Sequence, residues 1–226
     1  MPPLPLTWHW QPFGAAALLL EVHGPEQEAN RAVLALAAQL SAAPPLGMLA
    51  AVPAISSLLI TFDPLVATHE QLQAQIEPLC ATFGPAPAAP LRIHELPVAY
   101  GGTDGPDLVA VAQALGMTPQ AVITLHSGQL YRVMMLGFAP GFPYLGPLPA
   151  ALHLPRRATP RSAVPPGAVA IAAGLTGIYP TSLPGGWHLI GRTPSILFDP
   201  HADPPARLAP GDGVRFLVAR RGIREN

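Results

Sequence analysis

The stretch GFAPGFPYLGPLP, residues 137–149, decides how the second half of the chain folds. Seven of its thirteen positions are Gly or Pro, which disfavour both a helix interior and a central strand, because Pro donates no backbone N–H and Gly loses the most entropy when it is ordered. The stretch therefore predicts an ordered loop. Its aromatic side chains, Phe138, Phe142 and Tyr144, are expected either to fill a hydrophobic core beneath that loop or to line a ligand cleft.

From residue 130 onward the chain consists of short apolar runs separated by Gly and Pro turns, a pattern typical of a closed or nearly closed β-barrel. A strand over 91–100 and two short helices, one over 107–115 and one that Thr118 caps, precede these runs. We therefore predict a mostly-β barrel domain over residues 91–226. Its later strands are expected at 131–136, 168–172, 188–190, 196–198 and 214–218.

Residues 1–86 show a different pattern, in which strands and helices alternate. Apolar residues spaced three and four apart predict the first helix, and Thr68 with Gln71 forms a capping box at the start of the second. The expected elements are a strand at 15–22, a helix after Pro25, strands at 46–52 and 56–62, and the helix from Thr68. This order predicts an α+β domain of ferredoxin-like kind, and the proline-spaced GPAPAAP at 84–90 predicts a stiff linker after it.

Composition argues against several classes of protein. With 226 residues, of which 50% are hydrophobic and 11% charged, the chain has enough apolar surface for packed cores. No apolar run approaches the roughly 20 residues of a membrane-spanning helix, and no basic stretch followed by an apolar core appears near residue 1, so we expect a cytoplasmic protein. The basic residues are too sparse for a nucleic-acid surface, and no nucleic-acid partner is expected.

The cysteine, histidine and basic residues narrow the possible chemistry. Cys80 is the single cysteine, which excludes an internal disulfide framework. The eight His show no metal-ligand spacing, and we expect no metal site. All 12 basic residues are Arg, so a carboxylate or phosphoryl group bound by this chain must be held by Arg side chains or by backbone amides.

Side chains suited to an anion recur in three segments, 155–167, 174–180 and 184–194. Arginine presents a planar fork of donors that matches a carboxylate or a phosphoryl group. Because loops at one end of a barrel converge, we expect the three segments to meet at one mouth of the barrel. The residues concerned are Arg157, Thr159, Arg161, Thr176, Tyr179, Trp187, His188 and Arg192.

Several candidate residues, His126 included, can instead have a purely structural role. Trp187 on a barrel strand is more often part of the core than a ligand platform, and Arg157 can be a solvated surface charge. Tyr179 can anchor its loop through a hydroxyl hydrogen bond. His126, at the end of a predicted helix, can be a surface residue stabilised by the helix dipole.

Four motifs, GFAPGFPYLG, TPRSAVPPG, TGIYP and GGWHLIGRTP, occur in this order and resemble the signature of the PxpB/KipI family. The family is also called allophanate hydrolase subunit 1 or the carboxyltransferase C and D domain. The similarity extends over nearly the full chain, including AALLLEV at 16–22, NRAVLALAAQL at 30–40 and VAYGGTDGPDL at 98–108.

The resemblance implies the B subunit of an ATP-dependent 5-oxoprolinase, which opens the lactam of 5-oxoproline to glutamate together with PxpC-like and PxpA-like subunits. It also implies an N-terminal α+β domain and a cyclophilin-like barrel, with ATP as the cofactor of the assembled complex. The family usually has Gln directly before TGIYP, whereas this chain has Leu175. If that side chain contacts ligand, polar recognition is weaker or altered here.

Opening a lactam with ATP passes through phosphorylated intermediates, so the site must neutralise oxyanions and exclude bulk water. His126 and His188 are candidate general bases because an imidazole titrates near neutrality. From the resemblance we expect catalytic roles for Arg161, Arg192, Tyr179 and His126, and substrate contacts from Phe142, Tyr144, Arg157, Thr159, Thr176, Trp187 and His188.

A second hypothesis is a protein-binding regulator. The KipI members of the family resemble inhibitors of a sensor histidine kinase, for which the barrel would be a docking surface. A neighbouring gene for a PxpC-like or PxpA-like protein would favour the enzyme, and kinase inhibition by the purified chain would favour the regulator. Prolyl isomerisation and carboxyl transfer rest only on the fold and on the family's other name.

Overall fold

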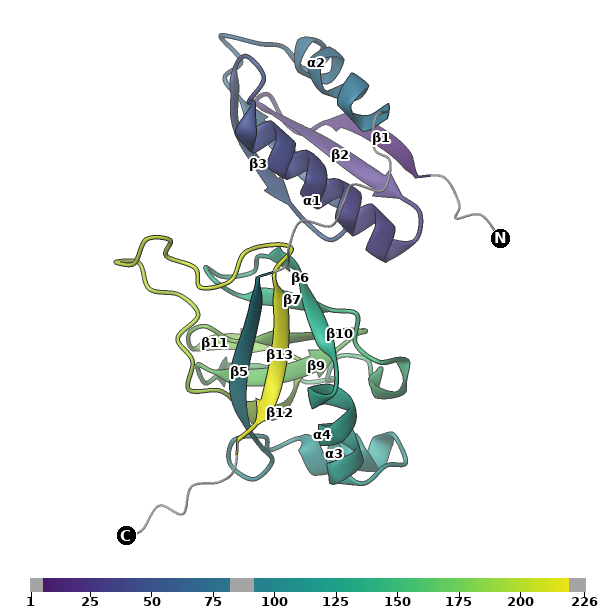
Figure 1. The fold of residues 1–226 in the computed structure, drawn as a ribbon, viewed down its shortest axis with the longest axis vertical. Coiled ribbons are helices and arrows are strands. Elements are labelled where there is room, and N and C mark those ends of the chain that lie inside the picture. Colours follow the sequence, from purple (N-terminus) through teal and green to yellow (C-terminus); the bar gives the residue numbers. More distant parts are fainter. Residues whose placement is uncertain (1–5, 82–91, 220–226) are drawn as a thin grey trace. The chain divides into compact units, whose positions relative to one another are not determined.

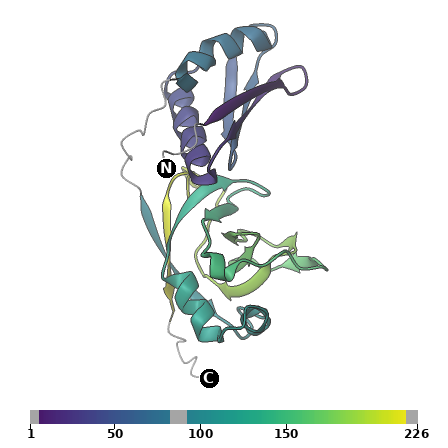
Figure 2. The same ribbon diagram turned by 90° about the vertical axis from the view of Figure 1, so that its right-hand side faces the viewer.

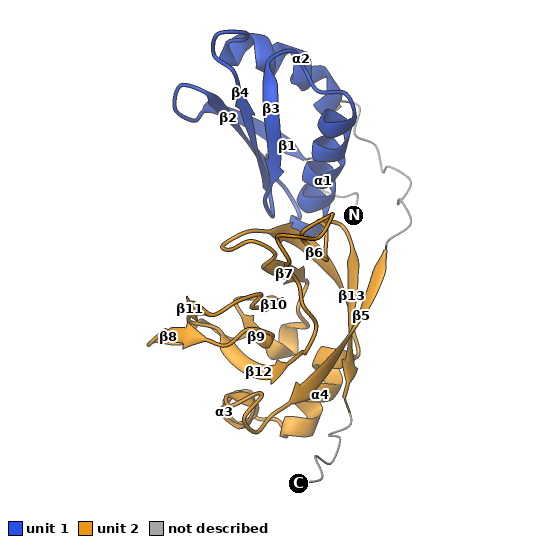
Figure 3. Ribbon diagram, turned by 90° about the vertical axis from the view of Figure 1, so that its left-hand side faces the viewer, with its two compact units in different colours: residues 1–90 blue, residues 91–226 orange. Residues whose placement is uncertain are grey.

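The computed structural model describes residues 6–81 and 92–219, and the predicted linker at 84–90 lies outside these ranges. The chain divides into two compact units, residues 1–90 and 91–226, which are coloured separately in Figure 3. In the described residues no single helix is long and apolar enough to cross a membrane. Two short helices of the second unit reach that length and composition only when taken together, and they are bent by 97°.

The first unit is a four-stranded antiparallel sheet with two helices, in the strand order β1-β2-β4-β3 (Figure 1). Thr68 and Gln71 form the predicted capping box, since each backbone N–H donates to the other residue's side chain, at 3.0 and 3.3 Å. The predicted order lacked the edge strand β1, and the ferredoxin-like assignment stays a prediction. The elements are β1 (Thr7–Pro12), β2 (Ala17–His23), α1 (Glu26–Ala42), β3 (Met48–Pro53), β4 (Ser57–Phe62) and α2 (His69–Ala81).

The core of the first unit lies between the helices and one face of the sheet. The apolar positions of α1 that recur three and four apart, including Val33, Leu36 and Leu40, are fully buried. They pack in one cluster with Leu20 of β2 and Ile60 of β4. The helical periodicity of the sequence therefore predicted the correct buried face.

The second unit is a closed barrel with the strand order β10-β7-β6-β13-β5-β12-β9, which confirms the predicted mostly-β barrel. β5 and β13 pair in parallel, and the other barrel pairs are antiparallel. The narrower cyclophilin-like assignment stays a prediction. The strands are β5 (Ile93–Tyr100), β6 (Leu130–Leu136), β7 (Pro143–Gly146), β8 (Arg161–Val164), β9 (Ala168–Ala172), β10 (Leu175–Ile178), β11 (Leu183–Gly185), β12 (His188–Arg192) and β13 (Gly213–Val218).

Two helices and a short strand pair complete this unit. α3 (Leu108–Ala114) and α4 (Pro119–Ser127) lie together at one end of the barrel (Figures 1 and 2), and η1 (Ala150–Leu152) is a single 3-10 turn. β8 and β11 pair only with each other and form a ribbon that projects from the barrel (Figure 3). The ribbon belongs to the segments in which anion-binding residues were predicted.

Two local expectations in this unit were wrong. The 137–149 stretch is not all loop, because it contains β7, which pairs with β6 and β10 through its middle residues Tyr144 and Leu145. Pro143 is tolerated because it is the first residue of the strand. The strand expected at 196–198 is only an isolated bridge between Phe198 and Ala206.

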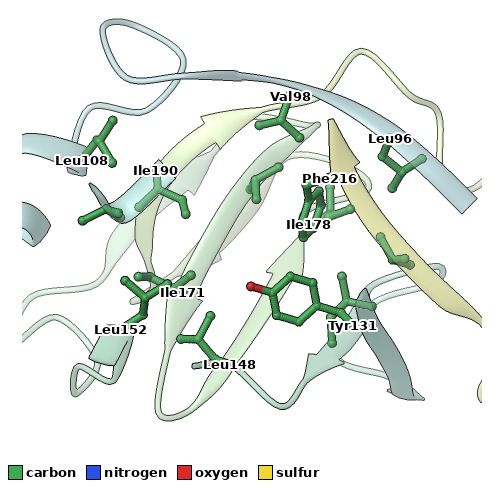
Figure 4. Close-up of a cluster of buried hydrophobic side chains, with 14 of the residues drawn as sticks. Leu96, Val98, Leu108, Tyr131, Leu148, Leu152, Ile171, Ile178, Ile190 and Phe216 are labelled. Atoms are coloured by element: carbon green, nitrogen blue, oxygen red, sulfur yellow. The ribbon is translucent and has the colours of Figure 1, made fainter. Parts of the chain in front are cut away.

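The barrel interior is filled by side chains and forms the main core of the unit. Figure 4 shows Leu96 and Val98 of β5 in one cluster with Ile171, Ile178 and Phe216, the last of which pairs with Leu96 on the neighbouring strand β13. All five of these side chains have at most 1% of their surface exposed. The barrel is therefore a packed body, and a site must be built at its ends or on its outer loops.

Candidate functional site

An ion cluster around Asp107 brings together two of the three predicted arginines. Arg161 donates to both carboxylate oxygens of Asp107, at 2.8 and 2.9 Å, and Arg157 donates to Oδ1 at 3.0 Å. The backbone N–H of Leu189 adds a fourth bond, to Oδ2 at 2.8 Å. Asp107 is buried, whereas a third of the Arg157 side chain and a quarter of the Arg161 side chain remain exposed. Both side chains are thus held in place while part of each reaches solvent.

The position of Asp107 follows from local backbone structure. It directly precedes α3, but its side chain makes no capping hydrogen bond to that helix, so both oxygens are free for the arginines. Its backbone N–H donates to Leu189 O at 2.9 Å, which fixes the residue against β12. The arginines are held opposite Asp107 by the ribbon and by the residues next to it. Arg161 of β8 pairs with Gly185 of β11, and Arg157 N donates to Gly186 O at 2.8 Å. Three segments, around residues 107, 157–161 and 185–189, therefore meet at one carboxylate.

The pKa of Asp107 is lowered. Burial alone would raise it, but the hydrogen bonds from Arg161 and Leu189 and the charges of both arginines outweigh burial. With Asp107 ionised, the three side chains carry one net positive charge. The cluster can therefore hold an additional anion on its solvent side.

The predicted aromatic residues also meet, in a cluster beside these arginines. Phe142 packs edge-on against both Tyr179 and Trp187, with ring centroids 5.1 and 6.0 Å apart, and all three side chains are buried. Tyr144 is half-buried and contacts Phe142 and Trp187, whereas Phe138 is 58% exposed. Phe142, Tyr179 and Trp187 thus form a core, and Tyr144 and Phe138 form its border.

The two tyrosine hydroxyls of this cluster remain protonated donors at neutral pH. Burial, followed by the neighbouring Tyr144, raises the pKa of Tyr179, and Arg156 and Arg161 oppose the rise only in part. Burial likewise raises the pKa of Tyr144 against the opposing charge of Arg156. The phenols and guanidinium groups therefore offer neutral and charged donors on one side of the barrel.

Of the two glycines at 185–186, only one has no room for a side chain. A Cβ on Gly185 would overlap the Tyr179 hydroxyl oxygen, whereas the nearest atoms to a Cβ on Gly186 are 3.7 Å away. We expect Gly185→Ala to lower the free energy of unfolding by about 1–3 kcal/mol, because the buried Tyr179 must move. Gly186→Ala is the matched control, and equal urea midpoints for the two variants would contradict this packing.

His126 and Thr176 lie elsewhere, inside the barrel. His126 is fully buried, stacked on Phe216 at 4.7 Å, so the surface position considered for it is wrong. Thr176 Oγ1 donates to Ala170 O at 3.0 Å and must therefore accept from His126 Nε2–H at 2.9 Å. The other ring nitrogen accepts from the Tyr100 hydroxyl at 2.8 Å. Every polar hydrogen in this series of bonds has a protein partner.

Burial lowers the pKa of His126 to about 3. The imidazole is neutral at physiological pH, and Nδ1 and Nε2 are both engaged in hydrogen bonds. The reason given for a general base, titration near neutrality, therefore does not hold for His126. The structure shows this residue as part of the barrel's packing.

The remaining predicted residues do not join the Asp107 cluster in the part of the chain that the structure describes. Arg192 is exposed and its Nε donates to Pro166 O at 3.0 Å. His188 Nε2 bonds Pro155 O at 2.9 Å, and Thr159 is exposed. Within residues 6–81 and 92–219 no group of three His, Cys, Asp or Glu side chains could hold a metal ion.

Asp107 and Arg156 were not among the predicted site residues. Asp107 was noted only as the start of a helix, which an Asp in that position normally caps. Its partners are 50 and 54 residues away in the sequence, and no local pattern indicates such a pairing. The four motifs GFAPGFPYLG, TPRSAVPPG, TGIYP and GGWHLIGRTP contain no acid to balance Arg157 and Arg161, and VAYGGTDGPDL offers two, Asp104 and Asp107, between which the sequence does not choose.

Comparison with known proteins identifies relatives over most of the chain. The family described as carboxyltransferase domain, subdomain C and D, matches residues 8–208. A protein of Bacillus subtilis (strain 168), named as the B subunit of 5-oxoprolinase, is 39% identical over 201 residues, 84% of both chains. A protein of the same name from Escherichia coli O157:H7 is 54% identical over 132 residues, which are 58% of this chain.

A crystal structure of TTHA0988 has the same fold, with a TM-score of 0.79 and 43% identity over 91% of this chain. The match covers only 40% of the TTHA0988 chain, and the match to the E. coli protein covers 61% of that protein. This chain thus corresponds to less than two thirds of those two relatives.

Proposed function

Because this chain belongs to the family of the carboxyltransferase domain, subdomain C and D, we propose that it is the B subunit of an ATP-dependent 5-oxoprolinase. The observation that carries the proposal is the shared name of relatives that are 39–54% identical to it. The matched residues 8–208 contain the Asp107 cluster and the aromatic cluster. The name of a subunit implies further subunits, and we propose PxpC-like and PxpA-like partners and a cytoplasmic complex.

The proposed reaction transfers the γ-phosphoryl group of ATP to the lactam oxygen of 5-oxoproline and releases ADP. Water then adds to the activated carbon and the ring C–N bond breaks, which gives γ-glutamyl phosphate with a free amino group. A second water hydrolyses this acyl phosphate to glutamate and phosphate. Negative charge develops on oxygen atoms in each of these steps, so fixed positive donors stabilise the transition states. The solvent-exposed parts of Arg157 and Arg161 supply such donors, and the half-buried Tyr144 supplies a neutral one.

Asp107 has a positioning role in this proposal. It occupies one side of each guanidinium group and leaves the other side for the anion. A preorganised donor loses no reorganisation energy when charge develops, which is the usual source of large catalytic effects. The proposal therefore assigns anion binding to Arg157 and Arg161 rather than to Arg192, which lies apart from them.

The test is to reconstitute a complex of this chain with the proteins encoded by the genes next to its own. We expect the purified complex to release ADP only when 5-oxoproline is present, and the isolated chain to show no such activity. Loss of the chain from the mixture should abolish turnover. A complex that hydrolyses no ATP with 5-oxoproline, together with kinase inhibition by the isolated chain, would refute the proposal and favour the regulator.

Replacing Arg161 tests the site within that complex. We expect Arg161→Ala to lower 5-oxoproline-dependent ADP release by at least about tenfold, because a charged donor to the developing oxyanion is lost. Partner binding, measured by pull-down, should persist. Among the described residues the exposed Arg215 forms an ion pair only with the exposed Glu95, so Arg215→Ala should change turnover by less than about twofold. Equal activity of the two variants would remove Arg161 from the site.

A further inference from the structure

A concave site lies on the barrel unit, and its lining contains no residue of the Asp107 cluster. It has a volume of about 340 Å³ and lies between the start of β5 and the segment 196–207 that connects β12 with β13. Its polar lining comes from Arg92, His94, Asp199 and Arg207. The volume is in the range of small-molecule sites in proteins. None of its lining residues takes part in the site described above.

The walls of this pocket are fixed by hydrogen bonds. In the 196–207 segment, Arg207 N donates to Leu197 O and Asp199 N donates to Pro205 O, both at 2.9 Å, so the segment is a closed hairpin loop. Leu197 and Leu208 are buried in the barrel core and anchor the loop at its base. The loop therefore has a defined backbone, the path of which is drawn in Figure 1.

The opposite wall is equally well defined. Gly213 N donates to Arg92 O at 2.9 Å, which fixes the backbone at the start of β5. The buried His94 bonds Asp212 Oδ2 through Nε2 at 2.9 Å, and the same carboxylate oxygen accepts from Ala209 N at 3.0 Å. The His94–Asp212 pair thus joins β5 to the chain that follows the hairpin loop.

Charge in the pocket is not balanced by the residues that the structure describes. The guanidinium groups of Arg92 and Arg207 make no ion pair with any residue in 6–81 or 92–219. Asp199 accepts a hydrogen bond from His201 N through Oδ1, and Oδ2 accepts none from those residues. Two cationic forks and one carboxylate oxygen therefore face the same hollow and can bind a ligand.

The pocket also has an apolar side. Ile196 is 72% exposed although its neighbour Leu197 is buried, and Pro204 and Pro205 line the pocket with it. A bound molecule would remove this apolar surface from water, which favours binding. Small-molecule sites commonly combine a few fixed polar groups with such apolar walls.

From these observations we propose that the pocket binds a small organic anion. Its carboxylate or phosphate would lie against Arg92 and Arg207, a hydrogen-bond donor of the ligand would meet Asp199, and its carbon skeleton would cover Ile196. An amino acid, a lactam acid and a nucleotide share this chemistry. The proposal does not rest on the proposed function, since binding is a property of the chain alone.

Calorimetric titration of the isolated full chain with 5-oxoproline, glutamate, ADP and inorganic phosphate tests the proposal. We expect saturable binding of at least one of the three organic anions, and the ligand that binds shows whether the anion is a carboxylate or a nucleotide phosphate. Arg92→Gln and Arg207→Gln should each weaken binding by at least about fivefold, because each removes a charge-assisted hydrogen bond.

Arg215→Gln is the matched control, since it removes an exposed arginine from the same barrel outside the pocket. Its affinity should stay within about twofold of the unchanged protein. Both pocket arginines are exposed, so their replacement should leave the circular dichroism spectrum and the melting temperature unchanged. Binding of phosphate alone, of no probe, or equal weakening by all three variants would overturn the proposal.

Discussion

Asp107→Ala is expected to destabilise the barrel unit by about 3–5 kcal/mol, because it leaves two arginines and a buried backbone N–H without their carboxylate. The loss should appear as a large fall in the urea midpoint. Trp187 is buried beside the cluster and reports the unfolding of this unit when the other two tryptophans, Trp8 and Trp10, are replaced by Phe. In that double variant the tryptophan fluorescence reports the unfolding of the barrel unit alone.

Asp104→Ala is the matched control for this prediction. Asp104 lies three residues away, is half-buried, and makes no ion pair in the described part of the chain. Its replacement should change the free energy of unfolding by less than about 0.5 kcal/mol. If Asp107→Ala and Asp104→Ala had the same midpoint, the ion cluster would contribute nothing to the stability of the barrel.

The pH dependence gives an independent check on Asp107. Its pKa in the folded chain is below the ordinary value of 3.8, so its stabilising contribution is present above pH 3.8 and is lost as the pH falls through the folded pKa. Asp107→Asn keeps the shape of the side chain but cannot titrate. The acid-induced fall in stability below pH 3.8 should therefore be smaller in Asp107→Asn than in the unchanged protein.

The parts of the fold that the sequence predicted are those set by local pattern. The periodic apolar residues of α1, the capping box at Thr68 and the strand β9 all depend on residues within one element. Helical periodicity places a side chain on a face without reference to any other part of the chain. These elements therefore agree with the predictions to within a few residues.

The missed elements depend on pairing between distant segments. β8, β10 and β11 have only three or four residues each and contain Gly or Pro or few β-branched residues, so propensity alone does not indicate a strand. They are strands because partners are present: β10 lies between β7 and β9, and β8 pairs with β11. Such pairing is a tertiary property.

The candidate site likewise has features that local sequence indicates and features that depend on distant residues. Residue types and motif order predicted that segments 155–167, 174–180 and 184–194 meet at one mouth of the barrel. Arg157 and Arg161 do share one carboxylate, and Phe142 packs against Tyr179 and Trp187, but Thr176 and Arg192 have other partners. The sequence did not predict which acid would neutralise the arginines. It also placed His126 among the titrating groups, because a residue at a helix end reveals nothing of the barrel that covers it.

His126→Ala is expected to destabilise the barrel unit by about 3–5 kcal/mol. The change leaves a cavity against Phe216, and it removes the acceptor of the Tyr100 hydroxyl and the donor to Thr176 in a fully buried site. Urea unfolding followed by Trp187 fluorescence measures the loss. His126→Gln retains one donor and one acceptor and should recover part of the lost stability.

The pH profile distinguishes this structural role from a catalytic one. Because the folded pKa of His126 is about 3 and its ordinary value is 6.5, only the unfolded chain takes up this proton as the pH falls from 6.5 towards 3. Stability should fall over that window by about 1.4 kcal/mol more per pH unit in the unchanged protein than in His126→Gln. His201→Ala, which removes an exposed imidazole, should keep the full slope. Identical slopes in all three proteins would mean that His126 protonates in the folded barrel, and the buried series of hydrogen bonds through Thr176 would then be wrong.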